Sequence, residues 1–174
     1  MDDMTLIKDD ISHAMGAYAR EDYQESIRLF NKVLSENPEH RLSLLGRGSA
    51  YLKSDRLGEA MADFDRVIAL YPDYARAYHL RGVVKATRGD NLEAIKDFDK
   101  DIELDAVYGA AYTSRGTAHQ RLGHEDLAAE DMAMVTNLTQ VNLASYNDEN
   151  NVWQTQHMLV KDAIETELNR ETVP

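Results

Sequence analysis

The sequence of 174 residues contains no cysteine, only three prolines and a single tryptophan, and it has no long apolar run. Without cysteine, disulfides, thiolate chemistry and cysteine-containing metal sites are excluded. No stretch approaches the roughly 18 consecutive apolar residues of a membrane span. The acidic start, Met1 to Thr5, lacks the basic and apolar regions of a secretory signal. We therefore expect a cytoplasmic protein.

Basic residues are also scarce. The chain has 19 Lys and Arg residues against 31 Asp and Glu residues, which gives a formal net charge of -12. An acidic surface repels phosphate backbones and anionic lipids, so nucleic acid and membranes are unfavourable partners. Other proteins remain as partners, including basic ones.

The common signatures of enzymes are missing as well. The sequence has no Gly-x-x-x-x-Gly-Lys phosphate loop and no Gly-x-Ser-x-Gly elbow. No two of its six His residues are four apart, the spacing that puts two metal ligands on one helical face. We expect no catalytic residues, no metal and no cofactor.

What the sequence does contain is a repeat. Arg-Gly occurs at Arg47, Arg81 and Arg115, thirty-four residues apart, and each time Ala-x-x-Asp-Phe or a close relative follows at the same offset. A fixed period of this length is typical of stacked supersecondary units. The pattern predicts four repeats, over about 7–40, 41–74, 75–108 and 109–142, each made of two helices.

Matching positions of the repeats explain how the helices would pack. Small residues in both helices allow a close approach, and a bulky apolar residue in the second helix fills the contact. These residues are Gly48, Gly82 and Gly116, then Ala60, Ala94 and Ala128, then Phe64, Phe98 and Met132. The turn between helices falls at Glu21, Asp55, Gly89 and Gly123, and Pro38 and Pro72 stop second helices.

This combination of period, Gly, Ala, Phe and terminal Pro resembles the tetratricopeptide repeat. Residues 41–74 match best, through Leu44, Gly48, Tyr51, Ala60, Phe64 and Pro72. The resemblance covers residues 7–142 and implies an all-α, right-handed superhelix of four helix-turn-helix repeats. A C-terminal capping helix would complete it, giving nine helices.

The C-terminal part departs from the repeat. The polar residues 139–150 predict a loop, and helical periodicity returns from about 151 to 170. Trp153, His157, Val160, Ile164 and Leu168 form one apolar stripe there. We expect this helix to cap the fourth repeat; a helix folded into the groove, or docked on a second copy, is the alternative.

The repeated Arg suggests a ligand site at first, yet an Asp follows each one after sixteen residues. The first block loses both residues together, with His13 and Leu29 in their places. Arg suits a half-buried, bidentate carboxylate pair. We therefore predict a structural ladder of Arg–Asp pairs, either within one repeat or from one repeat to the next.

A second polar cluster is less regular. Asp101 stands where the other blocks carry Val33, Val67 and Val135, and Lys85 and His119 occupy a column of the first helices. A buried Asp101 flanked by these two basic residues would form a satisfied polar seam. The alternative is a pH-sensitive or ligand-binding spot.

In the tetratricopeptide family, the first helices line a concave groove that binds partner peptides. By column, the groove residues here would be Leu45, Ser49, Arg76, His79, Leu80, Val83, Thr113, Thr117, Gln120 and Arg121. The two columns where carboxylate-clamping members need Asn carry none, so that clamp is not expected. An apolar peptide or helix is favoured, unless Leu45, Leu80 and Val83 only pack one repeat on the next.

The resulting hypothesis is a non-catalytic protein-interaction module, a scaffold or adaptor that binds a segment of another protein. The alternative is structural self-assembly into a homo-oligomer, through the C-terminal helix or the exposed ends of the stack.

Overall fold

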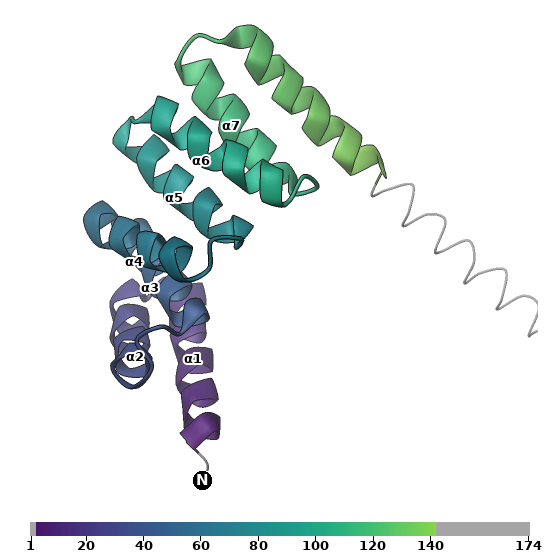
Figure 1. Ribbon diagram of the computed structural model, residues 1–174. Coiled ribbons are helices and arrows are strands. Elements are labelled where there is room, and N and C mark those ends of the chain that lie inside the picture. Colours follow the sequence, from purple (N-terminus) through teal and green to yellow (C-terminus); the bar gives the residue numbers. More distant parts are fainter. Residues whose placement is uncertain (1–2, 142–174) are drawn as a thin grey trace, which may run out of the picture.

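The computed structural model describes residues 3–141, and these residues form helices joined by short turns, with no strand. The labelled helices are α1 (Asp3–Ala19), α2 (Tyr23–Glu36), α3 (Arg41–Lys53), α4 (Leu57–Leu70), α5 (Ala75–Arg88), α6 (Asn91–Leu104) and α7 (Gly109–Arg121). Residues 125–141 form one more helix, which we call the final helix. Figure 1 shows these helices stacked in pairs, which confirms the predicted all-α repeat fold.

The turn inside each pair falls at the predicted position. Glu21, Asp55, Gly89 and Gly123 all have positive φ, between 60° and 90°. A residue in this left-handed region ends a helix and redirects the chain, so the second helix returns along the first. Glu21 and Asp55 adopt the conformation without being glycine, which shows that the fold requires it.

Glycine in the odd-numbered helices permits the predicted close contact. A Cβ atom added to Gly82 would lie 2.6 Å from the ring of Phe98, and one added to Gly48 would lie 2.7 Å from that of Phe64. Such distances do not occur between real side chains, so a larger residue would push the two helices apart. Phe64 and Phe98 are fully buried as a result.

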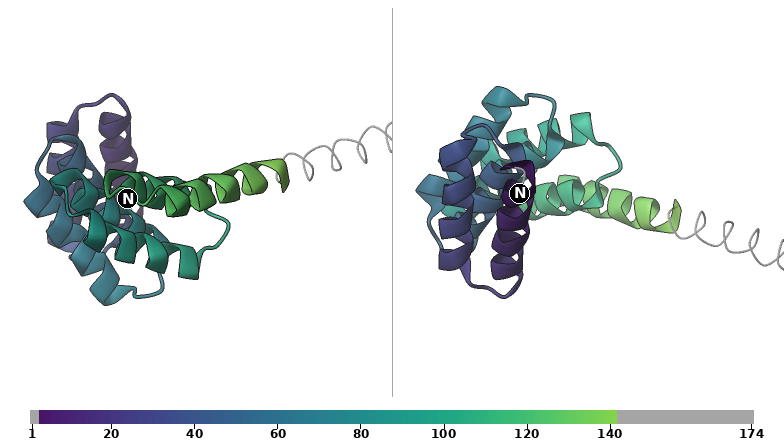
Figure 2. Two further views of the ribbon diagram at one scale, coloured as in Figure 1. Left: turned by 90° about the horizontal axis from the view of Figure 1, so that it is seen from above. Right: turned by 90° about the horizontal axis from the view of Figure 1, so that it is seen from below.

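The odd-numbered helices form the inner layer of the stack. α1 contacts α3, α3 contacts α5 and α5 contacts α7, whereas α2, α4 and α6 contact only odd-numbered helices among those labelled. Consecutive odd helices are therefore closer together than consecutive even ones, and the stack curves with the odd helices on its concave side. Figure 2, which views the stack from above and below, shows each pair turned relative to the one before.

The final helix corrects the predicted loop over 139–150, because residues 139–141 are helical. α2 and α4 end shortly before Pro38 and Pro72, but Gln140 stands in this column and does not stop a helix. The rest of the predicted loop, and the predicted capping helix over 151–170, lie outside the described residues. Within 3–141, no helix has the length and apolar character needed to cross a membrane.

Candidate peptide-binding surface

The predicted Arg–Asp ladder exists, and its pairs lie within single repeats. Nε of Arg47 donates to Asp63 at 2.9 Å and its Nη2 donates at 2.6 Å. Arg81 and Asp97 repeat this geometry at 2.9 and 2.6 Å, and Arg115 and Asp131 form the third pair. Each pair joins the first helix of a repeat to the second helix of the same repeat.

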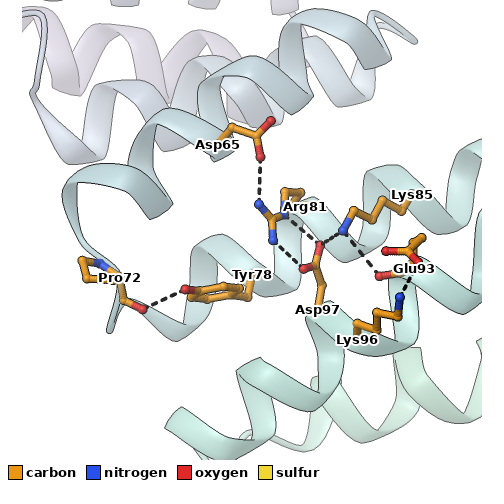
Figure 3. Close-up of polar contacts among 8 residues, drawn as sticks. All are labelled: Asp65, Pro72, Tyr78, Arg81, Lys85, Glu93, Lys96 and Asp97. Atoms are coloured by element: carbon orange, nitrogen blue, oxygen red, sulfur yellow. Dashed lines mark hydrogen bonds and ion pairs between the residues drawn. The ribbon is translucent and has the colours of Figure 1, made fainter.

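A third nitrogen of each Arg reaches back to the preceding repeat. Nη1 of Arg81 donates to Asp65 at 2.8 Å, as Figure 3 shows, and Nη1 of Arg115 donates to Asp99 at 2.7 Å. In the first step of the ladder, Asn31 accepts from Arg47 at 2.6 Å. The alternative pairing of Asp63 or Asp97 with the Arg of the next repeat was wrong, because a different side chain makes the link between repeats.

The ladder leaves no room for a ligand. The paired carboxylates of Asp63, Asp97 and Asp131 are buried, and each Arg uses both edges of its guanidinium. The side-chain hydrogen bond to Asp97 is the main cause that raises the pKa of Arg81 above its usual value. The charge on this Arg is therefore permanent, and the three pairs serve the fold.

The predicted polar seam around Asp101 was assembled from the wrong partners. Lys85 instead lies 2.8 Å from Asp97, on the second step of the ladder. The Asp101 carboxylate is completely buried, and a hydrogen bond of 3.0 Å joins its Oδ2 to Nδ1 of His79. His79 lies on the inner helix α5, two residues before Arg81. Comparison of equivalent positions in the repeats did not predict that it would pair with Asp101.

His119 also takes a different partner from the predicted one. Its Nδ1 lies 3.3 Å from Nδ1 of His124, so the two rings share a hydrogen bond across the turn after α7. Among residues 3–141, no three His, Cys, Asp or Glu side chains gather as metal ligands would.

A hollow of about 190 Å³ opens on the inner layer, between α5 and α7. Four of the predicted groove residues line it: Val83, Thr113, Thr117 and Arg121. A neighbouring hollow of about 410 Å³ shares Thr113 and Thr117 and adds Gln120. The structure thus brings half of the predicted groove residues together around one concave surface.

The other predicted groove residues lie in different surroundings. Leu45 is buried in the apolar core, and His79 is only 8% exposed. The guanidinium of Arg76 is exposed and contacts the hydroxyl of Tyr108. Ser49 and Leu80 are half-buried on α3 and α5. Leu45 and His79 therefore offer little surface to a ligand, which corrects their assignment to the groove.

Ser114 also lines this hollow, and so do three residues that were not predicted: Ala86, Thr87 and Phe98. Phe98 is equivalent to the buried Phe64 of the preceding repeat. It reaches the hollow because of how neighbouring repeats pack, and no local motif marks it. Ala86 and Thr87 lie one turn after Val83 on α5, and helical spacing alone would have found them.

Comparison with known proteins assigns part of the repeat region to a family. The profile of the tetratricopeptide repeat matches residues 11–75, so this part of the chain is built from tetratricopeptide repeats. A structure of MamA from Desulfovibrio magneticus RS-1, residue 41 to the end, superposes with a TM-score of 0.72 at 24% identity, over 78% of this chain and 76% of that one.

Two further proteins are similar to this chain, and one of them is described with a bound peptide. The first tetratricopeptide repeat domain of Spaghetti (RPAP3), bound to the HSP90 peptide SRMEEVD, has a TM-score of 0.64 at 23% identity, over 67% of this chain and 93% of that one. The tetratricopeptide repeat and J domain-containing co-chaperone DNJ1 of Fusarium oxysporum f. sp. lycopersici is 28% identical over 80 residues. That match covers 46% of this chain and 15% of the co-chaperone.

Three of the inner helices differ in charge from the outer ones. α3, α5 and α7 contain no Asp or Glu, although the whole protein has a net charge of -12. Their Lys and Arg residues are Arg41, Arg47, Lys53, Arg76, Arg81, Lys85, Arg88, Arg115 and Arg121. These three helices are therefore basic on an acidic protein, whereas the inner helix α1 carries Asp9 and Asp10 beside Lys8.

The pair of His79 and Asp101 yields a stability prediction. His79→Leu should lower the free energy of unfolding by about 3 to 5 kcal/mol, because it leaves a buried carboxylate without its partner. The equivalent residues of the second repeat are Leu45 and Val67, both buried and apolar. The double variant His79→Leu/Asp101→Val should therefore unfold at a urea concentration equal to or above that of the wild type.

Asp101→Val serves as the second single variant of this cycle. It should cost less than His79→Leu, about 1 to 3 kcal/mol, because a neutral imidazole is easier to bury than a carboxylate. Additive losses in the double variant would show that the two side chains do not stabilise each other.

Proposed function

We propose that this chain is a protein-interaction module, a scaffold or adaptor whose inner layer binds a segment of another protein. The hollow between α5 and α7 carries the proposal, since exposed Thr113, Thr117 and Arg121 surround it on the concave side. The Arg and Asp side chains of the ladder already hydrogen-bond one another. The side chains available to a partner are therefore the others that line the hollow.

The chemistry of this surface suits a peptide or a helix. Val83 supplies apolar contact at its floor, and the hydroxyls of Thr113 and Thr117 and the guanidinium of Arg121 supply hydrogen bonds at its rim. Apolar anchors contribute roughly 25 cal/mol per Å² buried, and polar contacts at the rim fix register. The similarity to a repeat domain bound to an HSP90 peptide supports a protein partner in general terms.

Thr117→Trp should block this surface, because Thr117 is exposed and lines both hollows. The amount of each partner captured by this variant should be at least about tenfold lower than with the 174-residue wild type, the equivalent of 1.4 kcal/mol, as measured by quantitative mass spectrometry. Each such partner should then be purified and its affinity for both proteins measured by titration calorimetry.

Thr136→Trp is the matched control. Thr136 is an exposed Thr of the final helix, and its hydroxyl donates to the Met132 carbonyl at 3.0 Å, as that of Thr117 donates to the Thr113 carbonyl at 2.8 Å. This variant should keep every partner. Equal binding by Thr117→Trp and the wild type would exclude the inner layer as the binding surface.

A second candidate function, self-assembly, is supported by the open end of the stack. Met132 is 41% exposed, whereas Phe64 and Phe98 in its column are 0% and 1% exposed. The hollow of about 410 Å³ lies beside Met132, between α7 and the final helix. In the inner repeats this face is covered by the next odd helix, so a second copy docked here would bury an equivalent surface.

Sedimentation velocity over a hundredfold range of protein concentration tests this second candidate. Self-assembly predicts a mass that rises with concentration, and Met132→Glu should keep the protein monomeric because it places a charge in the contact. Met134→Glu, at an equally exposed position on another face of the final helix, should assemble as the wild type does. A wild-type monomer at every concentration would remove this candidate.

A further inference from the structure

Two histidines of the fourth repeat face each other across the turn that follows α7. Nδ1 of His119 and Nδ1 of His124 are 3.3 Å apart, and the centres of the two rings are 5.6 Å apart. As a hydrogen bond this contact is long, because N–H donors in proteins mostly lie about 2.7 to 3.2 Å from their acceptors. The pair therefore needs a second explanation.

The backbone of the turn fixes the positions of both residues. The amide of His124 donates to the carbonyl of His119 at 3.0 Å, and Gly123 has a φ of 77°. The carbonyl of His124 then accepts from the amide of Ala128 at 3.1 Å, where the final helix begins. His119 is half-buried on α7, and His124 is exposed. Because the two residues are already tied together, little conformational freedom is lost when a ligand joins their rings.

The distance between the two nitrogens matches one coordination geometry in particular. Zn²⁺ binds imidazole nitrogens at about 2.0 to 2.1 Å, and its protein sites are mostly tetrahedral. Two such bonds at the tetrahedral angle place the nitrogens about 3.3 to 3.4 Å apart, which is the spacing of His119 and His124. A right angle between bonds of this length, as in tetragonal Cu²⁺ or Ni²⁺ sites, would bring the nitrogens to about 2.8 to 3.0 Å.

Packing of the repeats does not require this pair. The equivalent residues of the second repeat are Tyr51 and Arg56, and the guanidinium carbon of Arg56 lies 4.4 Å from the centre of the Tyr51 ring. Those of the third repeat are Asp90 and Lys85, and Lys85 pairs with Asp97 of the ladder. Both positions carry His only in the fourth repeat, although other side chains serve the same turn elsewhere.

The surroundings of the pair favour a cation. A hollow of about 460 Å³ is lined by His124 together with Glu125 and Asp126, which are both exposed. Arg121, the basic residue nearest in the sequence, donates to the Ala86 carbonyl at 3.0 Å, so its guanidinium is held against α5. The net charge of -12 also raises the concentration of cations around the protein.

We propose that His119 and His124 form a Zn²⁺ site, with Nδ1 of each ring as a ligand and water in the two remaining tetrahedral positions. The carboxylates of Glu125 and Asp126 accept hydrogen bonds from the bound water. The ion joins α7 to the final helix across the turn. Its two open positions leave it accessible to a donor atom of another molecule, unlike a closed structural site with four protein ligands.

The spacing of the ligands explains why the sequence did not predict this site. A metal was excluded there because no two His are four residues apart on one helix. His119 and His124 are five residues apart, and the chain reverses between them at Gly123. The site does not depend on the function proposed above.

Zinc titration of the 174-residue protein tests the site, after a chelator has removed bound metal and with a zinc-binding dye as competitor. We expect one Zn²⁺ per chain. His119→Gln and His124→Gln should each weaken its binding at least about tenfold, because a neutral amide is a poor zinc ligand. Equal binding by the wild type and the double variant His119→Gln/His124→Gln would mean an adventitious ion only and would overturn the proposal.

Two further variants separate ligation from packing. His13→Gln is the matched control, because His13 is an exposed His on the first helix of another repeat; it should bind Zn²⁺ as the wild type does. In His124→Asp, Oδ1 takes the place of Nδ1, one bond beyond Cγ, and a carboxylate is a zinc ligand. This variant should bind Zn²⁺ more tightly than His124→Gln, and no difference between the two would refute ligation by residue 124.

Nuclear magnetic resonance of the imidazole nitrogens identifies the ligating atoms. One equivalent of Zn²⁺ should shift the Nδ1 resonances of His119 and His124 and leave those of His13 in place. Because the spacing suits a tetrahedral ion, Zn²⁺ should also displace Ni²⁺ from the pair. Tighter binding of Ni²⁺, or shifts confined to other His residues, would contradict the assignment.

Discussion

The structure depends on a guanidinium held by three acceptors. Each ladder Arg closes its own helix pair through two hydrogen bonds to a buried Asp, and its third nitrogen reaches the preceding repeat. Arg81, for example, joins Asp97 on α6 to Asp65 on α4. Apolar packing of Phe against Gly is tolerant of small rotations between repeats, but a planar fork with fixed donors is not. The ladder therefore sets the register of the stack, and the curvature that exposes the inner layer depends on that register.

Sequence columns predicted this construction because every repeat is a copy of the others. The period located the turns at Glu21, Asp55, Gly89 and Gly123. The first repeat lacks both the Arg and the Asp, and this joint absence indicated that the two residues pair in the other repeats. Where a residue departs from its column, the comparison fails. His79 and Asp101 replace a Leu and a Val together, and only the structure shows that they face each other. Gln140 replaces a Pro, and the helix continues through a predicted loop.

The sequence columns and the family resemblance predicted ten groove residues, and the structure brings only part of this set together. Val83, Thr113, Thr117 and Arg121 line one hollow. Leu45 occupies an equivalent column but is buried, because inner-layer residues near a repeat boundary pack on the next helix. The amino-acid composition also did not predict the sign of the charge on the inner helices α3, α5 and α7. The net charge of -12 gave no sign that three inner helices lack acidic residues, because the acidic residues of α1, the outer helices and the turns dominate the sum.

The central claim is that the ladder builds the fold, while other side chains of the inner layer carry the function. It is tested most directly by a double-mutant cycle on a step of the ladder that has no competing Lys, the pair of Arg47 and Asp63. Urea unfolding should show that Arg47→Met and Asp63→Leu each cost about 2 to 4 kcal/mol, and that the double variant costs no more than either one. The exposed pair of Arg56 and Glu59 is the control, with a coupling below about 1 kcal/mol. Additive costs for Arg47 and Asp63 would contradict the account, because independent side chains could not set the register of the stack.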